Sequence, residues 1–294
     1  MSLAFYLNIV TGGLLTGLVY GLAALGLALI FNVVGVINLA HGGVLVAGML
    51  AASWVAAARG ADPLLALPAV AAGLFVAGFL LQRLVIGRLD GSPESRRLPL
   101  MLGIGLMAMN GLVLLAGPNG RAAHPPNAAD ALSAGPLLFD RLELRAALIA
   151  LMVTAVLVFF FNVSRTGKAL RACADSPFGA RVAGLDVARL RAVAFGLGAA
   201  VTGTAGCLLA QIGPVRPALA PGHALTAFVI VLIGGLGSVE GALFGGLAVG
   251  VAEALGDTLL GPDLKSLPGC LLALLILLWR PGGFAAVTSS ETAE

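Results

Sequence analysis

The residues best suited to act on a solute lie at positions 35–43, where GVINLAHGG separates two long apolar runs. Asn38 and His41 can donate and accept hydrogen bonds, and neighbouring glycines such as Gly42 let the backbone leave helical geometry. Non-helical backbone at membrane depth is tolerated only where protein buries it or where it lines a wet cavity. The stretch therefore has two interpretations. It is either a break in a helix that lines a solute pathway, or a turn in which Asn38 caps the next helix.

A second group of residues could dock a partner protein. The basic loop at 162–191 contains RTGKALRACADSPFGARVAGLDVARLR, which predicts two short helices. Ser176 and Pro177 predict a helix start, and Gly184 predicts its end. A structured loop of this length is costly in conformational entropy unless it meets something. The alternatives are a solvated basic loop or a docking site, and Phe178 among small residues favours docking.

Signatures of catalysis and of ATP binding are missing from the sequence. The one Gly-Lys pair, Gly167-Lys168, lacks both the upstream glycine and the following Ser or Thr of a phosphate-binding loop. The apolar-segment carboxylates Glu253 and Asp257 lie far along the chain from His41, which disfavours an intramembrane enzyme. The three cysteines show no metal-ligand spacing. We therefore expect a non-catalytic chain that binds no cofactor or metal of its own.

Glycines spaced four residues apart form two ladders, Gly13–Gly17–Gly21 and Gly237–Gly241–Gly245. Small residues at this spacing let membrane helices approach closely. We expect both ladders to be packing devices.

The composition is that of a membrane protein. The chain has 294 residues, of which 59% are hydrophobic and 11% charged, and its mean hydropathy is +1.03. Soluble domains carry about 25% charged residues, so the surface of this chain must face lipid. The net charge of +3 does not suggest nucleic-acid binding, because the basic residues lie in short loops between apolar runs.

Long continuous apolar runs, rather than alternating ones, predict an all-α polytopic transmembrane bundle. About 20 apolar residues cross a bilayer, which gives eight or nine membrane segments. The expected segments are 9–31, 41–58, 64–86, 98–116, 144–161, 192–212, 224–236, 242–260 and a short last one at 267–279.

The basic loops predict the orientation. Residues 82–97 carry four arginines and residues 162–191 carry six basic residues, so both loops should be cytoplasmic. This places the N-terminus outside, the tail after Arg280 inside, and the Pro- and Ala-rich loop 117–143 outside. A re-entrant pair at 224–260 would leave the number of spans open.

Three stretches resemble the permease subunits of branched-chain amino acid importers driven by ATP-binding-cassette ATPases. They are TGLVYGLAALGLALIFNVVGVINLAHGGVLVAGM, GKALRACADSPFGARVAGLDVARLRAVAFGLGAAVTGTAGCLLA and AFVIVLIGGLGSVEGALFGG. The resemblance covers nearly the whole chain and implies one transmembrane permease domain over residues 1–294. Permeases for urea and short amides look similar, so the resemblance is less specific for the solute.

The resemblance also implies partners: a second permease subunit, usually a different chain, two cytoplasmic ATPase subunits that use ATP and Mg, and an extracytoplasmic solute-binding protein in a bacterial-type cytoplasmic membrane. It implies that loop 162–191 is a coupling loop, shaped by Gly167, Arg171, Asp175 and Gly184, which docks through Pro177, Phe178, Ala180 and Val182. It places Asn38 and His41 near the pathway. A stand-alone channel or an ion-coupled carrier is the competing class, but it would not need this coupling loop.

Overall fold

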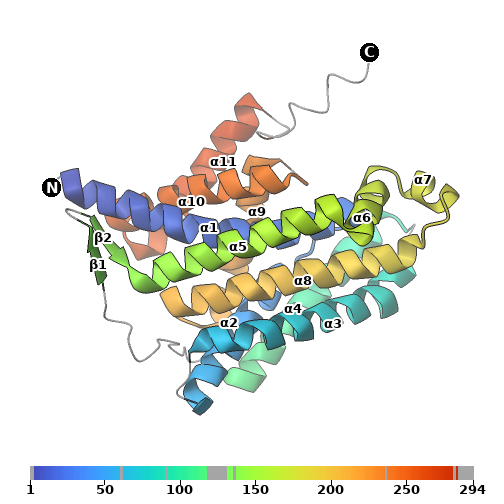
Figure 1. Cartoon of the computed structure of the whole chain (residues 1–294), viewed down its shortest axis with the longest axis horizontal. Coiled ribbons are helices and arrows are strands. Elements are labelled where there is room, and N and C mark those ends of the chain that lie inside the picture. Colours follow the sequence, from blue (N-terminus) through green and yellow to red (C-terminus); the bar gives the residue numbers. More distant parts are fainter. Residues whose placement is uncertain are drawn as a thin grey trace.

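A computed structural model describes residues 3–59, 62–89, 92–117, 131–134, 137–235, 237–280 and 283, which form a bundle of helices with one small hairpin (Figure 1). The long helices are α1 (Leu3–Val34), α2 (His41–Arg59), α3 (Leu67–Leu84), α4 (Glu94–Ala116), α5 (Arg141–Val163), α8 (Val187–Ile212), α9 (Ala220–Gly234), α10 (Val239–Leu260) and α11 (Leu267–Trp279). Two short helices, α6 (Arg165–Asp175) and α7 (Pro177–Val182), lie between α5 and α8.

Nine helical stretches in the described residues are long and apolar enough to cross a membrane. The predicted all-α polytopic bundle is therefore confirmed, and each predicted segment matches one of these stretches. One local difference is a two-stranded antiparallel hairpin of β1 (Ala131–Ala134) and β2 (Leu137–Asp140), inside the loop expected to be external. Most of the rest of that loop lies outside the described residues.

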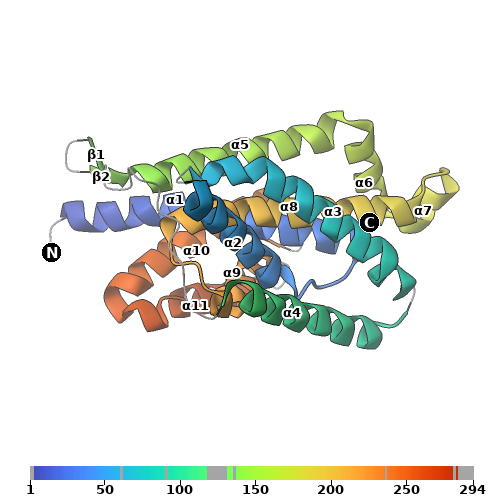
Figure 2. The same cartoon turned by 90° about the horizontal axis from the view of Figure 1, so that it is seen from below.

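The bundle has two distinct ends (Figures 1 and 2). The N-terminus of α1 and the β1–β2 hairpin lie at one, which we call the hairpin end, and Asn8 Oδ1 accepts a hydrogen bond from Leu138 N there at 2.9 Å. The helices α6 and α7 lie at the other, which we call the α7 end. At the hairpin end Arg145 of α5 donates to Asp62 Oδ2 and to Gln211 Oε1, each at 2.5 Å, so it links three elements.

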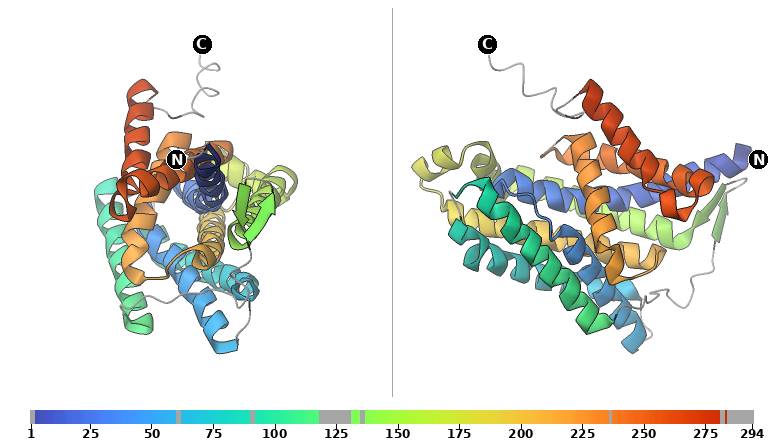
Figure 3. Two further views of the ribbon diagram at one scale, coloured as in Figure 1. Left: turned by 90° about the vertical axis from the view of Figure 1, so that its left-hand side faces the viewer. Right: turned by 180° about the vertical axis from the view of Figure 1, so that it is seen from behind.

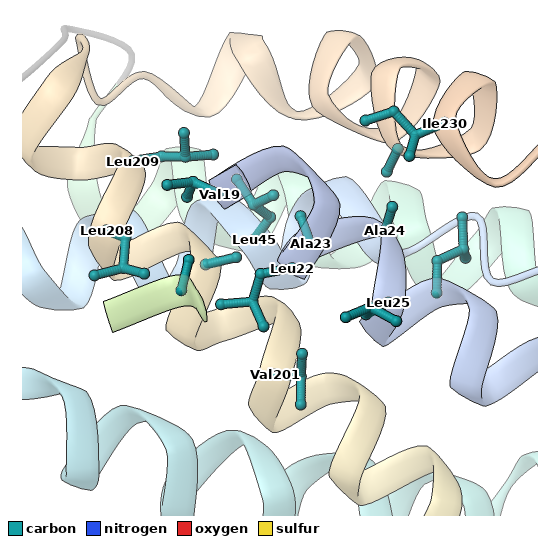
Figure 4. Close-up of a cluster of buried hydrophobic side chains, with 14 of the residues drawn as sticks. Val19, Leu22, Ala23, Ala24, Leu25, Leu45, Val201, Leu208, Leu209 and Ile230 are labelled. Atoms are coloured by element: carbon teal, nitrogen blue, oxygen red, sulfur yellow. The ribbon is translucent and has the colours of Figure 1, made fainter. Parts of the chain in front are cut away.

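Helix α8 is the centre of the bundle, and α1, α2, α3 and α5 pack around it. Apolar side chains of α1, α2, α8 and α9 meet in the main core, among them Leu22, Leu45, Leu208 and Ile230 (Figure 4). Small residues allow this approach. A Cβ on Gly26 of α1 would lie 2.7 Å from the backbone oxygen of Gly198 of α8, so the two backbones are in contact.

Two helices, α2 and α9, run obliquely to α1, α5 and α8 (Figures 2 and 3). Each begins after a non-helical or tightly turned stretch, residues 35–40 before α2 and residues 213–219 before α9. Pro217 opens a short 3-10 helix at 217–219, which leads directly into α9. These two starts position the candidate site.

Candidate functional site

The break between α1 and α2 is a six-residue stretch held by its own hydrogen bonds. Gly35, at φ +69°, lets the chain leave α1 in a conformation that a side chain disfavours. Asn38 Oδ1 then accepts from Ala40 N at 3.1 Å, and Asn38 O accepts from His41 N at 3.2 Å. Asn38 is buried, with 4% of its surface exposed. The side chain of Asn38 therefore closes a turn just before α2 and does not bond an N–H group of the helix itself.

This turn lies deep in the bundle. The His41 Nδ1 and Thr202 Oγ1 atoms are 3.4 Å apart, and Thr202 is near the middle of the 26-residue helix α8. A helix of that length is about 39 Å long and crosses the whole hydrocarbon layer. Helix α2 therefore begins near the centre of the membrane. Irregular backbone at this depth is expected where it is buried or lines a cavity.

The start of α9 meets the start of α2. Gly42 lies against the backbone carbonyl of Ala220, and a Cβ at position 42 would collide with that oxygen. Position 42 therefore requires glycine for this contact. The first turn of α2 and the first residue of α9 are therefore in backbone contact near the middle of the bundle.

A cavity of about 550 Å³ opens beside these helix starts. Asn38, Gly42 and Gly43 line it from the break, and Ala220 and Pro221 line it from α9. The remaining wall is largely apolar and comes from α1, α4 and α9: Leu27, Leu98, Leu102, Leu106, Met109, Leu225 and Phe228. Asn38 supplies the one polar side chain among the described residues of this lining. The surface suits a solute with an aliphatic part.

His41 has a different place from the one expected by resemblance. Its side chain is 1% exposed and is not among the lining residues of the cavity. The ring packs toward Thr202 of α8, and no hydrogen-bond partner is described for its Nε2 atom. The structure thus brings Asn38 and Gly42 to the cavity wall and places His41 behind it.

The basic loop 162–191 folds into an arm, made of α6 and α7, at the α7 end. Ser164 Oγ accepts from Gly167 N at 2.8 Å and caps α6. Gly167 lies so close to the backbone of α5 that a Cβ would be 2.6 Å from Phe161 Cα. Arg171 donates to the Phe161 carbonyl at 2.5 Å and to Asn162 Oδ1 at 2.9 Å. These contacts fasten α6 to the end of α5.

Helix α7 is capped at both ends as the sequence predicts. Ser176 Oγ accepts from Gly179 N at 3.0 Å, and Pro177 takes the first helical position. Gly184 has φ +80°, and Leu185 N donates back to Ala180 O at 3.0 Å, which closes the helix in a Schellman-type turn. A six-residue helix is too short to be stable alone, so these caps and its packing hold it.

The residues expected to dock a partner divide into two groups. Phe178 and Val182 are 77% and 74% exposed, whereas Ala180 is buried with Leu170 and Cys173 in a small core under the arm. Pro177 is partly buried, and Asp175 is exposed at the end of α6. Ala180 therefore anchors the arm, and Phe178 and Val182 remain as its outward apolar surface.

The first glycine ladder faces α10. Cβ atoms on Gly13, Gly17 and Gly21 would lie 2.9, 2.7 and 3.3 Å from backbone oxygens of Gly250, Gly246 and Ala242 respectively. The two helices run antiparallel in backbone contact.

The glycines of the second ladder have different packing partners. Gly241 and Gly245 pack against Gly234 and Ile230 of α9, not against α1. Gly237 precedes α10 in a turn with φ +98°, where its carbonyl accepts from Asn32 Nδ2 at 2.5 Å. The packing expected of Gly237 therefore belongs instead to Gly246 and Gly250.

The cavity wall on α4 and α9 could not be found from the sequence, because its side chains are apolar like those of a lipid-facing surface and no periodic pattern marks the wall face. The sequence analysis assigned no role to the carboxylate of Glu253. Glu253 is 6% exposed and accepts from Thr226 Oγ1 at 3.0 Å, so it links α10 to α9.

Comparisons with known proteins give the family. Residues 9–279 match the model for "Branched-chain amino acid transport system / permease component". The chain is 32% identical to the high-affinity branched-chain amino acid transport system permease protein BraD of Pseudomonas aeruginosa and 30% identical to LivH of Salmonella typhimurium, over 95% of both chains in each case. It is 35% identical to the fructose import permease protein FrcC of Rhizobium meliloti over 44% of this chain and 38% of that protein.

No solved structure was found to match the chain significantly. The family match covers far more than half of the chain and agrees with the bundle of apolar helices. This chain therefore belongs to the family of permease components of branched-chain amino acid transport systems.

Proposed function

We propose that this chain is one of two permease subunits that form the pathway of an ATP-driven importer for branched-chain or closely related aliphatic amino acids. The observation that carries the proposal is the arm. Two short capped helices fastened to α5 and to a small core of their own present Phe178 and Val182 to the surroundings. A stand-alone channel has no need of such a rigid apolar projection at the membrane surface.

The arm has the properties of a mechanical link to an ATPase subunit. Exposed apolar side chains on a soluble projection mark a protein contact. Because Gly167 and Arg171 tie α6 directly to the end of α5, a push on α7 is transmitted to a transmembrane helix. ATP and Mg belong to two partner ATPase subunits in this proposal, and the permease is not itself a catalyst.

The cavity beside α2 and α9 is the candidate pathway. Its apolar wall fits an aliphatic side chain better than it fits urea or a sugar, which need many hydrogen-bonding partners. The names of BraD and LivH agree with an amino acid as solute. Rocking of the two permease subunits about this cavity would expose it to each side in turn.

Charge supports the orientation expected from the sequence. Residues 82–97 and 162–191 carry four and six basic residues, which is ten of the 17 lysines and arginines in the chain, so the α7 end faces the cytoplasm in a cytoplasmic membrane. The hairpin end then faces outward, toward an extracytoplasmic solute-binding protein. A second permease subunit of related sequence completes the pathway.

The test is co-purification of the tagged chain from its native membrane in mild detergent, with the Phe178→Asp variant alongside. We expect an ATPase subunit and a second permease to accompany the unmodified chain. The aspartate places a charge at the proposed contact and should remove the ATPase while leaving the second permease bound.

Leu138→Asp is the matched control, because it puts the same charge on a residue 59% exposed at the opposite end of the bundle. Loss of the ATPase from both variants would point to misfolding. Retention of the ATPase by Phe178→Asp, or recovery of the unmodified chain alone, would contradict the proposal.

A further inference from the structure

The start of α2 offers hydrogen-bond donors that the protein itself leaves unused. Asn38 Oδ1 accepts from Ala40 N, which fixes the orientation of the amide, because only the oxygen can accept. The Nδ2 group therefore points the other way. No acceptor for Asn38 Nδ2 is described in the structured part of the chain, although the side chain is 96% buried and lines the cavity.

Two backbone groups add to this donor. The N–H groups of Gly42 and Gly43 belong to the first turn of α2, where a helix has no acceptor of its own. The chain provides bonds on either side, His41 N to Asn38 O and Val44 N to Ala40 O, but no acceptor is described for residues 42 and 43. Both glycines line the same cavity as Asn38. Neither glycine has a side chain that would cover its N–H group.

The electrostatics of the site favour an anion. The N-terminus of α2 carries the positive end of its macrodipole. No acidic or basic side chain is among the described residues that line the cavity. In a low-dielectric interior, unpaired donors have a strong preference for a negative group over a neutral one.

We propose that the start of α2 is the carboxylate subsite of the pathway. Asn38 Nδ2 and the N–H groups of Gly42 and Gly43 hold the α-carboxylate of the amino acid in transit. This inference rests on the proposed transport function and names the chemistry that the pathway recognises. The aliphatic side chain of the solute lies against Leu102, Leu106 and Phe228. Amides and urea, which lack a carboxylate, are disfavoured at the same place.

A cysteine-protection experiment on the purified permease–ATPase complex tests the subsite without ATP. The three native cysteines are replaced by alanine, and Leu106→Cys, on the cavity wall, is the reporter that reacts with N-ethylmaleimide. Millimolar leucine should slow this reaction. Leucinamide has the same side chain and ammonium group but no carboxylate, and it should give little protection.

Asn38→Asp is the variant that isolates the donor. The aspartate keeps an oxygen for Ala40 N, so the turn persists, but it replaces Nδ2 with a negative oxygen. We expect the apparent affinity for leucine, read from protection, to fall roughly 10- to 100-fold, since a hydrogen bond to a charged group is replaced by repulsion. Protection is compared with each variant's own labelling rate without leucine, because a new negative charge in the cavity changes the reactivity of the reporter thiol.

Asn8→Asp is the matched control. Asn8 also accepts a backbone N–H through its Oδ1, from Leu138 at 2.9 Å, but it lies at the hairpin end. It should leave protection by leucine unchanged. The subsite is refuted if leucinamide protects as well as leucine, if Asn38→Asp is protected normally, or if leucine gives no protection at all.

Failure of the proposed function gives a different signature. An unmodified complex that takes up no leucine with ATP would refute the transport proposal directly. An unmodified complex that takes up leucine, together with normal protection in Asn38→Asp, would refute the subsite alone. If Asn38→Asp does not assemble, the comparison of leucine with leucinamide on the unmodified Asn38 background still decides the question.

Discussion

Glycine has opposite uses in two regions of this bundle. Along α1 and α10, Gly13, Gly17 and Gly246 bring two backbones into contact, and all three glycines are buried. At the start of α2, Gly42 allows a close contact with α9, and Gly42 and Gly43 also line the cavity. Glycine therefore closes the interface between α1 and α10, whereas at the start of α2 it borders a cavity.

The difference shows why composition alone does not locate a pathway. In lipid, apolar burial hardly drives helix association, so close packing through small residues holds the bundle. A cavity is tolerated where other contacts fix its walls. Here Asn38 fixes the turn and the Gly42–Ala220 contact fixes the two helix starts. Glycines that pack two helices together and glycines that line the cavity should therefore respond differently to substitution.

The largest effect is expected at the sealed interface. Gly17→Leu forces a side chain into the backbone of Gly246, which cannot move away without separating α1 from α10. The loss of stability should be at least about 3 kcal/mol, the upper range for overpacking. The measurement is thermal stability of the detergent-solubilised protein by size-exclusion chromatography.

Gly73→Leu on α3 is the control for this substitution. Nothing lies within 4 Å of a Cβ at position 73, so this variant should remain close to the unmodified protein. Equal stability of the Gly17 and Gly73 variants would show that α1 and α10 are not in backbone contact.

A smaller loss of stability with a large loss of transport is expected from Gly42→Ala. Its methyl group collides with the Ala220 carbonyl and separates the starts of α2 and α9. We expect a destabilisation of about 1–3 kcal/mol, with leucine uptake reduced by more than stability explains. Gly222→Ala, in the first turn of α9 with open space around it, should keep uptake. Normal uptake by Gly42→Ala would show that the starts of α2 and α9 are not part of the pathway.

Removing a helix cap next to the sealed interface should have a moderate effect. Ser238 Oγ accepts from Gly241 N at 2.9 Å and caps α10. Ser238→Ala should cost about 1 kcal/mol, whereas Ser238→Asp should retain the cap and the stability. Thermal unfolding of the two variants in parallel checks this. A loss of stability in Ser238→Asp as large as in Ser238→Ala would show that the cap is not the cause.

The smallest effect is expected from Gly43→Ala. A Cβ there meets only the Ala108 methyl group at 3.1 Å, and the N–H of residue 43 is kept. Stability should change by no more than about 1 kcal/mol, since alanine is the better helix former and offsets the tight contact. The KM for leucine uptake should stay close to that of the unmodified protein. A large rise in KM would mean that space, rather than the donor, matters at position 43.

Much of the fold could be predicted from the sequence, because membrane helices are marked by length and hydropathy alone. The arm could also be predicted in detail, because the start and end of α7 depend on local interactions. Ser176 and Pro177 start this helix and Gly184 ends it. The sequence could not show that Ala180 is buried and Phe178 exposed. In so short a helix, this depends on the residues of α6 that pack against it.

The cavity could not be predicted, because its wall residues look like any lipid-facing residues. Leu106 and Phe228 become wall residues only when α4 and α9 are placed in space. The partners of the glycine ladder were hidden for a similar reason. Gly246 and Gly250 follow the same spacing of four residues, shifted by one from the ladder that the sequence suggested, and only the direction that α10 presents to α1 decides between them.

The most direct test of the central claim is uptake of radiolabelled leucine into proteoliposomes that contain the co-purified complex, its solute-binding protein and internal ATP. We predict accumulation above equilibrium that requires ATP, is lost in Phe178→Asp and is kept in Leu138→Asp. Equilibration of leucine at the same rate without ATP, or unchanged accumulation in Phe178→Asp, would contradict an importer driven through the arm.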